Sequence, residues 1–220
     1  MNLDIYQKIK SLADRKAVEL QRKVNQRLHE MSTDDQSHYL IYHILGVPSE
    51  EGYATDVYQN KGRFLYKYAG DFLEEAAIIC IQHKYPDARK IKIKNPYSNT
   101  PKNPYSNTPK TFEIDCLVES MAHEIKWRDA TTDGDHIAKE RTRVQAIKEQ
   151  GYVPIRIMFY YPQRKQAKKI QTDLAALYHE VGGRYYCGSK AWHYIYGYTG
   201  INLFEILTEI ERSRYNDAIQ

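Results

Sequence analysis

The spacing of apolar residues predicts a helical N-terminal part followed by an alternating α/β region. From Leu3 to about Ile44, apolar residues recur at helical spacing among charged ones. Glycine and proline residues then interrupt the pattern. A second helix is expected to begin near Asp71, which would cap it, with Glu74 three residues later as in a capping box.

Several segments with strand character follow this second helix. Apolar and polar residues alternate over Ala88–Lys94. Two further strand-like segments, "TFEIDCLVE" and "AHEIKWR", are joined by a very short turn. A last one, "YVPIRIMFYY", is strongly apolar. A helix is expected between the last two, from about Asp133 to Gln150. The order helix, strand, long loop, strand, strand, helix, strand predicts an α/β core with a central mixed β-sheet flanked by helices.

This pattern divides the chain into three regions that are expected to form one compact domain. Residues 1–69 form an N-terminal helical region, for which dimerisation and DNA contact are alternative roles. Residues 70–160 form the α/β core, and residues 161–220 are a C-terminal helical region that packs on the core. Within the core, "NPYSNTPK" occurs twice in tandem over 95–110. Its Asn-Pro, Ser-Asn and Thr-Pro steps predict an exposed duplicated loop, with partner contact as the alternative.

Composition narrows the class of protein. With 220 residues, 42% hydrophobic and 27% charged, the chain is suited to a folded protein with a substantial core. No apolar run reaches the roughly 20 residues of a membrane span, and the N-terminus lacks the apolar core of a signal peptide. The three scattered cysteines suit a reducing compartment, so we expect a cytoplasmic protein. The net charge of +4 permits a polyanionic partner without requiring one.

Charged residues interrupt the two strands on either side of the short turn. Alternation places Phe112, Ile114, Cys116 and Val118 on one face of the first strand, and Glu113, Asp115 and Leu117 on the other. In the second strand Glu124 and Lys126 share a face. Charges inside a sheet are costly unless another side chain, a metal or a substrate pairs with them.

The register of this β-hairpin decides whether the charges meet. A two-residue turn at Ser120 and Met121 would place Asp115 opposite Lys126 and bring Glu124 onto the same face. A three-residue turn without a bulge would separate the charged residues of the two strands. The two-residue turn also places the apolar residues of both strands on one face, so we predict that register.

Two converging carboxylates with a backbone carbonyl form an oxygen site that suits Mg²⁺. Asp115, Glu124 and the carbonyl of Ile125 are the candidate ligands. Lys126 could orient or deprotonate an attacking water, or neutralise charge that develops on a phosphate. Glu74 or Glu75 on the preceding helix could complete the metal shell. The alternative is a structural Asp115–Lys126 ion pair with Glu124 at its edge.

These residues resemble a known family. Asp115 followed by Glu124-Ile125-Lys126, in this order of elements, resembles the PD-(D/E)XK nuclease superfamily over about residues 70–160. More narrowly, "FEIDCLVESMAHEIKWRDATTDGDHI" resembles the ApaLI-like type II restriction endonucleases, and this likeness extends over most of the chain. One departure is Ile114, which stands where the superfamily usually has proline.

The resemblance implies a PD-(D/E)XK restriction-endonuclease-like core and a Mg²⁺-dependent nuclease, in which Mn²⁺ could substitute. By position, Asp115 and Glu124 would be metal ligands, Lys126 the catalytic lysine and Glu74 or Glu75 the helix carboxylate. Such enzymes are usually homodimers that cut double-stranded DNA at short palindromes, because two-fold protein symmetry matches that of the site. A cognate DNA methyltransferase is expected as a functional companion and not as a bound partner.

The segment that follows the second strand supplies candidate DNA contacts. Polar and basic side chains there suit hydrogen bonds to phosphates or base edges: Thr131, Thr132, Asp133, Asp135, His136, Lys139 and Arg143. Lys139 and Arg143 stand four residues apart and so share a helical face. The alternatives are a solvated basic face for these two and helix capping for Asp133 and Asp135.

Other functions stay open at this point. A structure-directed repair or junction-resolving nuclease would use the same chemistry, and a non-catalytic DNA-binding module would use only the basic surface. An RNA nuclease is a further alternative, although the sequence lacks the stacking motifs of the common RNA-binding modules.

Overall fold

The structure is a computed structural model that describes residues 2–98, 109–128 and 135–219, without the side chains of residues 135–136 and 217–219. The chain divides into two compact units. One unit contains residues 1–9 and 73–220, and the other contains residues 10–72. The predicted boundaries at residues 69 and 160, and the single compact domain, stay predictions.

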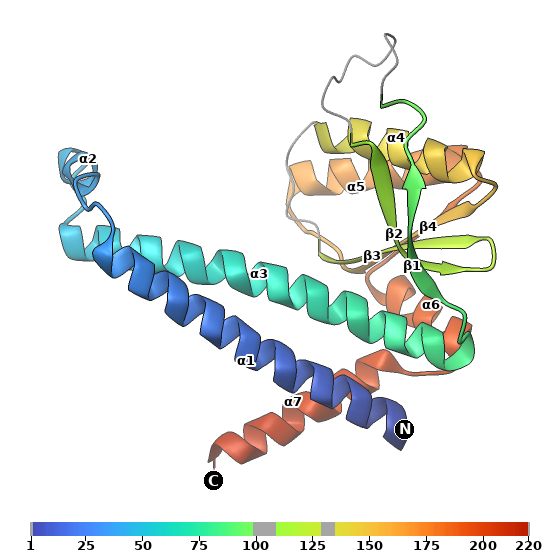
Figure 1. Cartoon of the computed structure of the whole chain (residues 1–220), viewed down its shortest axis with the longest axis horizontal. Helices are drawn as coiled ribbons and strands as arrows, with labels where there is room; N and C mark the ends of the chain where they lie inside the picture. The colour runs from blue at the N-terminus through green and yellow to red at the C-terminus, as the bar shows by residue number, and fades with distance from the viewer. Residues whose placement is uncertain (1, 99–108, 129–134, 220) are drawn as a thin grey trace. The chain divides into compact units, whose positions relative to one another are not determined.

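The smaller unit is built from helices. α1 (Leu3–Thr33) and α3 (Ser49–Lys84) run in opposite directions beside each other, joined through the short α2 (Tyr39–Ile44) (Figure 1). We call residues 10–72 the helical hairpin. The helical pattern predicted from Leu3 to Ile44 is present as two helices, α1 and α2, but the prediction of a helix that begins near Asp71 was wrong, because α3 begins 22 residues earlier, at Ser49. Glycines within residues 49–70 suggested a break that the helix does not make.

The larger unit contains a five-stranded mixed sheet in the order β1-β2-β3-β4-β5. Its strands are β1 (Arg89–Lys94), β2 (Thr111–Val118), β3 (Met121–Arg128), β4 (Val153–Tyr160) and β5 (Arg184–Cys187). The first three pair antiparallel, and β3, β4 and β5 are parallel. The predicted α/β class with a central mixed sheet is confirmed.

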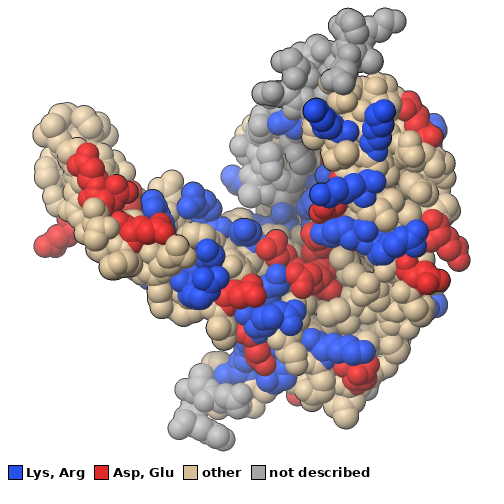
Figure 2. Space-filling model, viewed as in Figure 1, with Lys and Arg blue, Asp and Glu red and all other residues tan. Residues whose placement is uncertain are grey.

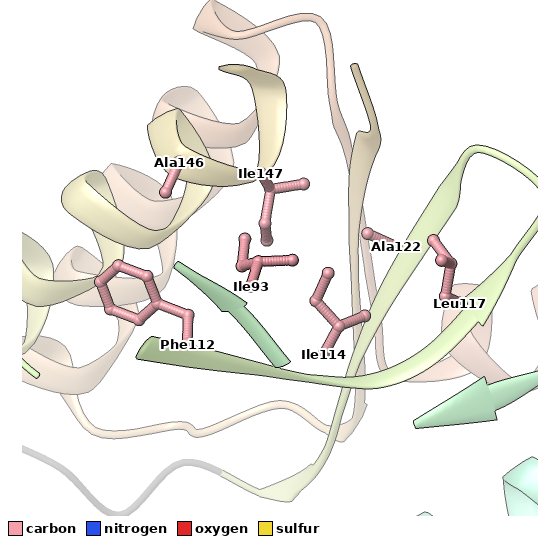
Figure 3. Close-up of a cluster of buried hydrophobic side chains, with 7 residues drawn as sticks. All are labelled: Ile93, Phe112, Ile114, Leu117, Ala122, Ala146 and Ile147. Carbon is pink, nitrogen blue, oxygen red and sulfur yellow. The ribbon is translucent and has the colours of Figure 1, made fainter. Parts of the chain in front are cut away.

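Helices cover both faces of this sheet. α4 (Asp135–Glu149) and α5 (Lys165–Glu180) lie on one face, and α6 (Ser189–Thr199) packs on the other, followed by α7 (Leu203–Ile219). Adjacent residues of β3 show the two sides, since Glu124 contacts Arg143 of α4 while His123 contacts Tyr194 of α6. Figure 3 shows the core between α4 and the first strands, formed by Ile93, Phe112, Ile114, Leu117, Ala122, Ala146 and Ile147.

Two elements were not predicted from the sequence. The aromatic segment after α5 forms β5 and α6, where stacked rings of Tyr186, Tyr194 and Tyr198 pack. These aromatic residues therefore build the sheet edge and its cover. Among the described helices, none is long and apolar enough to cross a membrane.

The base of the duplicated loop is closed by hydrogen bonds between the first residue of the first copy and the last two residues of the second copy. Asn95 is buried, its amide N–H donates to the Lys110 carbonyl at 2.9 Å, and its side-chain nitrogen donates to the Pro109 carbonyl at 2.7 Å. Residues 99–108 of the loop lie outside the described residues. These hydrogen bonds hold the two ends of the loop together between β1 and β2.

Candidate active site

The β2–β3 turn fixes where the charged residues meet. Cys116 pairs with His123 and Val118 with Met121, so the turn consists of Glu119 and Ser120. The predicted turn at Ser120 and Met121 was wrong, and the true register is shifted by two residues. Because side chains alternate with a period of two, a register shift of two residues does not by itself move a side chain to the other face.

A bulge in β2 changes the predicted faces. Between Ile91 and Arg89, β1 advances two residues while β2 advances three, from Ile114 to Leu117. The extra residue lies at Asp115 or Cys116 and places Leu117 in the same cluster as Phe112 and Ile114. The assignment of Leu117 to the opposite face was therefore wrong. Bulges commonly redirect side chains near active sites.

The strands β2 and β3 separate at this bulge, and the charged side chains converge there. The β2–β3 pairing ends at Cys116 and His123, and Asp115 Oδ2 accepts a hydrogen bond from the Ile125 amide at 2.8 Å. Lys126 Nζ lies 3.6 Å from Asp115 Oδ2 and 2.6 Å from Glu124 Oε1. Asp115, Glu124 and Lys126 thus form one cluster.

Burial makes this cluster electrostatically unusual. Asp115 is 6% exposed and Glu124 is 4% exposed. Burial raises the pKa of Asp115 to about 6, and the charge of Glu124 adds to this effect. Burial opposes the charged form of Lys126, but Glu124 and Asp115 more than offset it and raise the lysine pKa. Lys126 is therefore protonated at neutral pH and forms ion pairs with both carboxylates.

Arg143 of α4 is a fourth member of this cluster. Its Nη1 atom contacts Glu124 Oε1 and lies 3.7 Å from Glu140 Oε2. Burial opposes the charge of Arg143, yet Glu124 and Glu140 raise its pKa overall. Two carboxylates and two cations, Asp115, Glu124, Lys126 and Arg143, therefore balance one another in charge.

A second buried network supports Arg143 and was not predicted from the sequence. Glu140 Oε1 accepts hydrogen bonds from Arg156 Nη1 at 3.0 Å and from the Tyr178 hydroxyl at 2.6 Å. Arg156 and Tyr178 are fully buried, on β4 and α5. The sequence signal was an arginine in the strongly apolar strand "YVPIRIMFYY", which requires a buried carboxylate partner.

Of the two helix carboxylates, Glu74 is the one that acts on the cluster. Its charge contributes to the raised pKa of Asp115, and it accepts a hydrogen bond from Lys90 Nζ at 2.9 Å. The predicted capping role of Glu74 was wrong, because Glu74 lies far inside α3. Glu75 is half-buried and is not among the causes of the Asp115 shift. The electrostatic effect of Glu74 on Asp115 favours Glu74 over Glu75 as the additional carboxylate.

The structure separates the candidate DNA-binding residues. Lys139 is exposed on α4, one turn before Arg143, which instead contacts the carboxylate cluster. Thr131, Thr132 and Asp133 lie outside the described residues, as do the side chains of Asp135 and His136. Their predicted contacts with DNA stay predictions.

Side chains alone supply only part of the ligands that a hard divalent cation requires at this cluster. Among the described residues, no group of three or more His, Cys, Asp or Glu side chains could hold a metal ion. Asp115 and Glu124 supply two carboxylates, and the Ile125 peptide lies against Asp115. Two carboxylates and a carbonyl suit Mg²⁺, which keeps several waters among its ligands.

Comparison with known families identifies the chain. A sequence model of the ApaLI-like restriction endonuclease family matches residues 1–212. The chain belongs to this family. The matched range contains the whole Asp115–Glu124–Lys126 cluster and the Arg143 network. Neither the comparison with curated proteins nor the comparison with solved structures gave a match.

Proposed function

We propose that this ApaLI-like family member is a type II restriction endonuclease that hydrolyses double-stranded DNA at a short palindromic site with Mg²⁺. The observation that carries the proposal is the convergence of Asp115, Glu124 and Lys126 where β2 and β3 separate. The same arrangement supports membership of the PD-(D/E)XK superfamily. The family match supports the nuclease activity and, through it, DNA as the partner.

In this proposal Asp115, Glu124 and the Ile125 carbonyl hold the metal, with Glu74 as a further carboxylate nearby. Mg²⁺ bound there supplies positive charge that stabilises the charge developing on the phosphate, and Mn²⁺ would substitute for it. The hydrogen bond from the Ile125 amide orients the Asp115 carboxylate. This bond holds Asp115 beside Glu124 before DNA binds, so little reorganisation is required.

Lys126 and Arg143 provide the positive charge that the protein itself contributes. Protonated Lys126 forms an ion pair with Glu124 in the DNA-free protein, and it can donate a hydrogen bond to a phosphate oxygen that approaches the same place. Arg143 has five N–H donors and suits a phosphate equally well. Both cations would thus exchange a carboxylate for the phosphate of the bound DNA.

The proposal includes a homodimer, because a palindrome presents the same half-site on both strands. Two copies related by a two-fold axis would place one Asp115–Glu124–Lys126 cluster at each strand. The methyltransferase that would protect host DNA is expected to act separately. A cytoplasmic location stays a prediction from the sequence.

One digest tests the proposal. A fully sequenced plasmid is incubated with the protein in Mg²⁺, in Mn²⁺ and in EDTA. Discrete, reproducible fragments in both metals and intact plasmid in EDTA are expected. Cleavage only at junctions or damaged DNA would instead indicate a structure-directed nuclease, and binding without cleavage would indicate a DNA-binding module.

Variants connect the activity to the cluster. Asp115→Asn and Lys126→Ala should each lower the cleavage rate by at least about 100-fold, because each removes charge that is fixed in place before reaction. Their affinity for DNA should stay within about threefold of the parent. Glu113→Gln is the matched control, since Glu113 lies on the same strand but pairs with Lys90. It should cleave like the parent.

A further inference from the structure

The middle of the helical hairpin is strongly positive and its far end is negative. Residues 15–30 of α1 and 57–70 of α3 together contain eight Lys and Arg but only two acidic residues, Glu19 and Glu30. We call these two stretches the basic shaft. Residues 31–56 at the end of the hairpin contain five acidic residues and no Lys or Arg. Figure 2 shows blue side chains gathered along the shaft and red ones at the end.

A groove between the two helices concentrates this charge. It has a volume of about 240 Å³ and is lined by four residues of α1 and three of α3: Lys23, Gln26, Arg27, Glu30, Phe64, Lys67 and Tyr68. The two rings provide apolar surface on which the aliphatic stems of the cations can pack. The groove therefore presents three cations and one carboxylate, Glu30, from two helices to the same volume of solvent, so its net charge is positive.

Hydrogen bonds hold one of these cations in place. Arg27 Nε donates to Asn60 Oδ1 at 3.2 Å and Nη1 donates to Glu30 at 3.2 Å. Asn60 is in turn fixed by its own hydrogen bond to the Asp56 carbonyl at 2.8 Å. Among the described residues, Lys23 and Lys67 form no ion pair, so their charges are available to a ligand. A preorganised guanidinium loses less conformational freedom when it binds an anion.

We propose that the basic shaft binds the phosphate backbone of duplex DNA, independently of the recognition sequence. The inference rests on the proposed function, because it assumes that DNA is the partner, and it adds a second contact outside the carboxylate cluster. Lys and Arg that contact phosphates release condensed counterions, and this provides affinity without reading bases. The negative end of the hairpin is repelled by DNA, which limits the contact to the shaft.

The negative end of a second copy is the competing occupant, since its five carboxylates also complement the shaft. The two hypotheses predict different effects when the positive charges of the basic shaft are removed. If DNA occupies the shaft, neutral substitutions weaken DNA binding and leave the oligomeric state unchanged. If the end of another copy occupies it, they change the oligomeric state and leave the salt dependence of DNA binding unchanged.

The test is the salt dependence of DNA binding by the full-length protein. The variants are Lys23→Gln/Lys67→Gln and the same pair with Arg27→Gln added. The control is Lys165→Gln/Lys168→Gln/Lys169→Gln, which removes three exposed charges from α5. Binding to a duplex without a cleavage site is measured in EDTA at several salt concentrations. Thermal unfolding checks that each variant is folded, and sedimentation reports its oligomeric state.

Each lost phosphate contact reduces the steepness of log K against log salt concentration by about 0.9. The steepness for the triple variant should therefore be about 2.7 smaller than that of the parent. Between 50 and 200 mM salt, the affinity of the parent should then fall about 40-fold more than that of the variant. The α5 control should keep the slope of the parent. Duplex DNA should also protect Lys23 and Lys67 of the parent from amine labelling.

An unchanged slope in both shaft variants overturns the inference, as does equal labelling of Lys23 and Lys67 with and without DNA. A changed oligomeric state with an unchanged slope overturns it in favour of self-association. Plasmid cleavage by the parent separates this result from the proposed function. Discrete fragments with an unchanged slope would leave the nuclease standing and remove only the shaft contact.

Discussion

The Asp115 carboxylate accepts a hydrogen bond from the backbone amide of Ile125 at 2.8 Å, where the pairing of β2 with β3 ends. A side chain here takes the place that a backbone carbonyl would have in a continued ladder. A buried N–H group must find an acceptor, so the opening of the two strands and the position of Asp115 depend on each other. The bulge in β2 makes this exchange possible, because it displaces the Asp115–Cys116 backbone from the regular ladder.

Two buried groups near this point should give opposite pH dependences of stability. Burial raises the pKa of Asp115 to about 6 and lowers that of His123 to about 4. The folded state binds the Asp115 proton more tightly than the unfolded state, so Asp115 favours folding at low pH, and this contribution is lost as pH rises from about 4 to 6. For His123 the sign is reversed, and stability is lost as pH falls from about 6.5 to 4.

Asp115→Asn should reveal the contribution of His123 alone. In the parent the two contributions largely cancel between pH 4.5 and 6.5. In the variant, the free energy of unfolding should rise with pH by about 2 kcal/mol over this range. Urea denaturation at pH 4.5, 5.5 and 6.5 measures it, and Asn retains an oxygen that accepts from Ile125. A profile in the variant that matches the parent would contradict this assignment.

Arg143 should compete with a divalent cation for Glu124. It contacts Glu124 Oε1 together with Lys126, and like charges close together repel by several kcal/mol at the edge of a protein. Arg143→Ala should therefore bind Mn²⁺ roughly threefold to tenfold more tightly in the absence of DNA, as measured by calorimetry. The same variant should cleave DNA more slowly, because a donor to the phosphate is lost.

Arg141→Ala provides the matched control for this measurement. Arg141 lies on the same helix but is exposed and pairs with Glu180 at 3.3 Å. Its replacement removes the same charge from α4 without changing the cluster, so Mn²⁺ affinity should stay near that of the parent. Weaker binding of Mn²⁺ by Arg143→Ala would show that the arginine supports the metal site and does not compete with it.

Replacing only one member of the buried Glu140–Arg156 pair should lower the free energy of unfolding. Glu140→Gln or Arg156→Met removes one charge of this buried pair and leaves the other less compensated, and breaking a buried ion pair from one side typically destabilises a protein by about 3–5 kcal/mol. Replacing both residues should restore much of this loss, since no buried charge is then uncompensated. Urea denaturation of the two single variants and the double variant measures the coupling. Additive losses would mean that the two side chains do not depend on each other.

The sequence predicted the α/β class and the meeting of Asp115, Glu124 and Lys126, even though the register was wrong by two residues. Period-two alternation explains this in part, because a register shift of two residues leaves Glu124 and Lys126 on the face predicted for them. The bulge in β2 could not be predicted, since it depends on the pairing of Arg89 with Leu117 across two strands. The local sequence contains no glycine or proline that would indicate it.

Contacts between distant elements were the other limit. Glu140, Arg156 and Tyr178 come from α4, β4 and α5, and no spacing within one element relates them. β5 has four residues, too few to show an alternating pattern. α3 was misjudged because glycines in a helix are unfavourable on average, while packing between long helices overrides that preference. At Gly52 a Cβ atom would lie 2.5 Å from the Tyr42 ring, so close packing explains that glycine.

The β2–β3 turn provides a final prediction, about stability. Glu119 is the one described non-glycine residue with a positive φ, at 51°. A two-residue hairpin turn with a positive φ at its first position favours glycine there, since a side chain costs about 1 kcal/mol in this conformation. Glu119→Gly should therefore raise the free energy of unfolding by about 0.5–1 kcal/mol, as measured by urea denaturation. Glu119→Ala retains the Cβ atom and is the control. Equal stabilisation by both variants would attribute the gain to the loss of the carboxylate, whereas stabilisation by glycine alone would attribute it to the backbone.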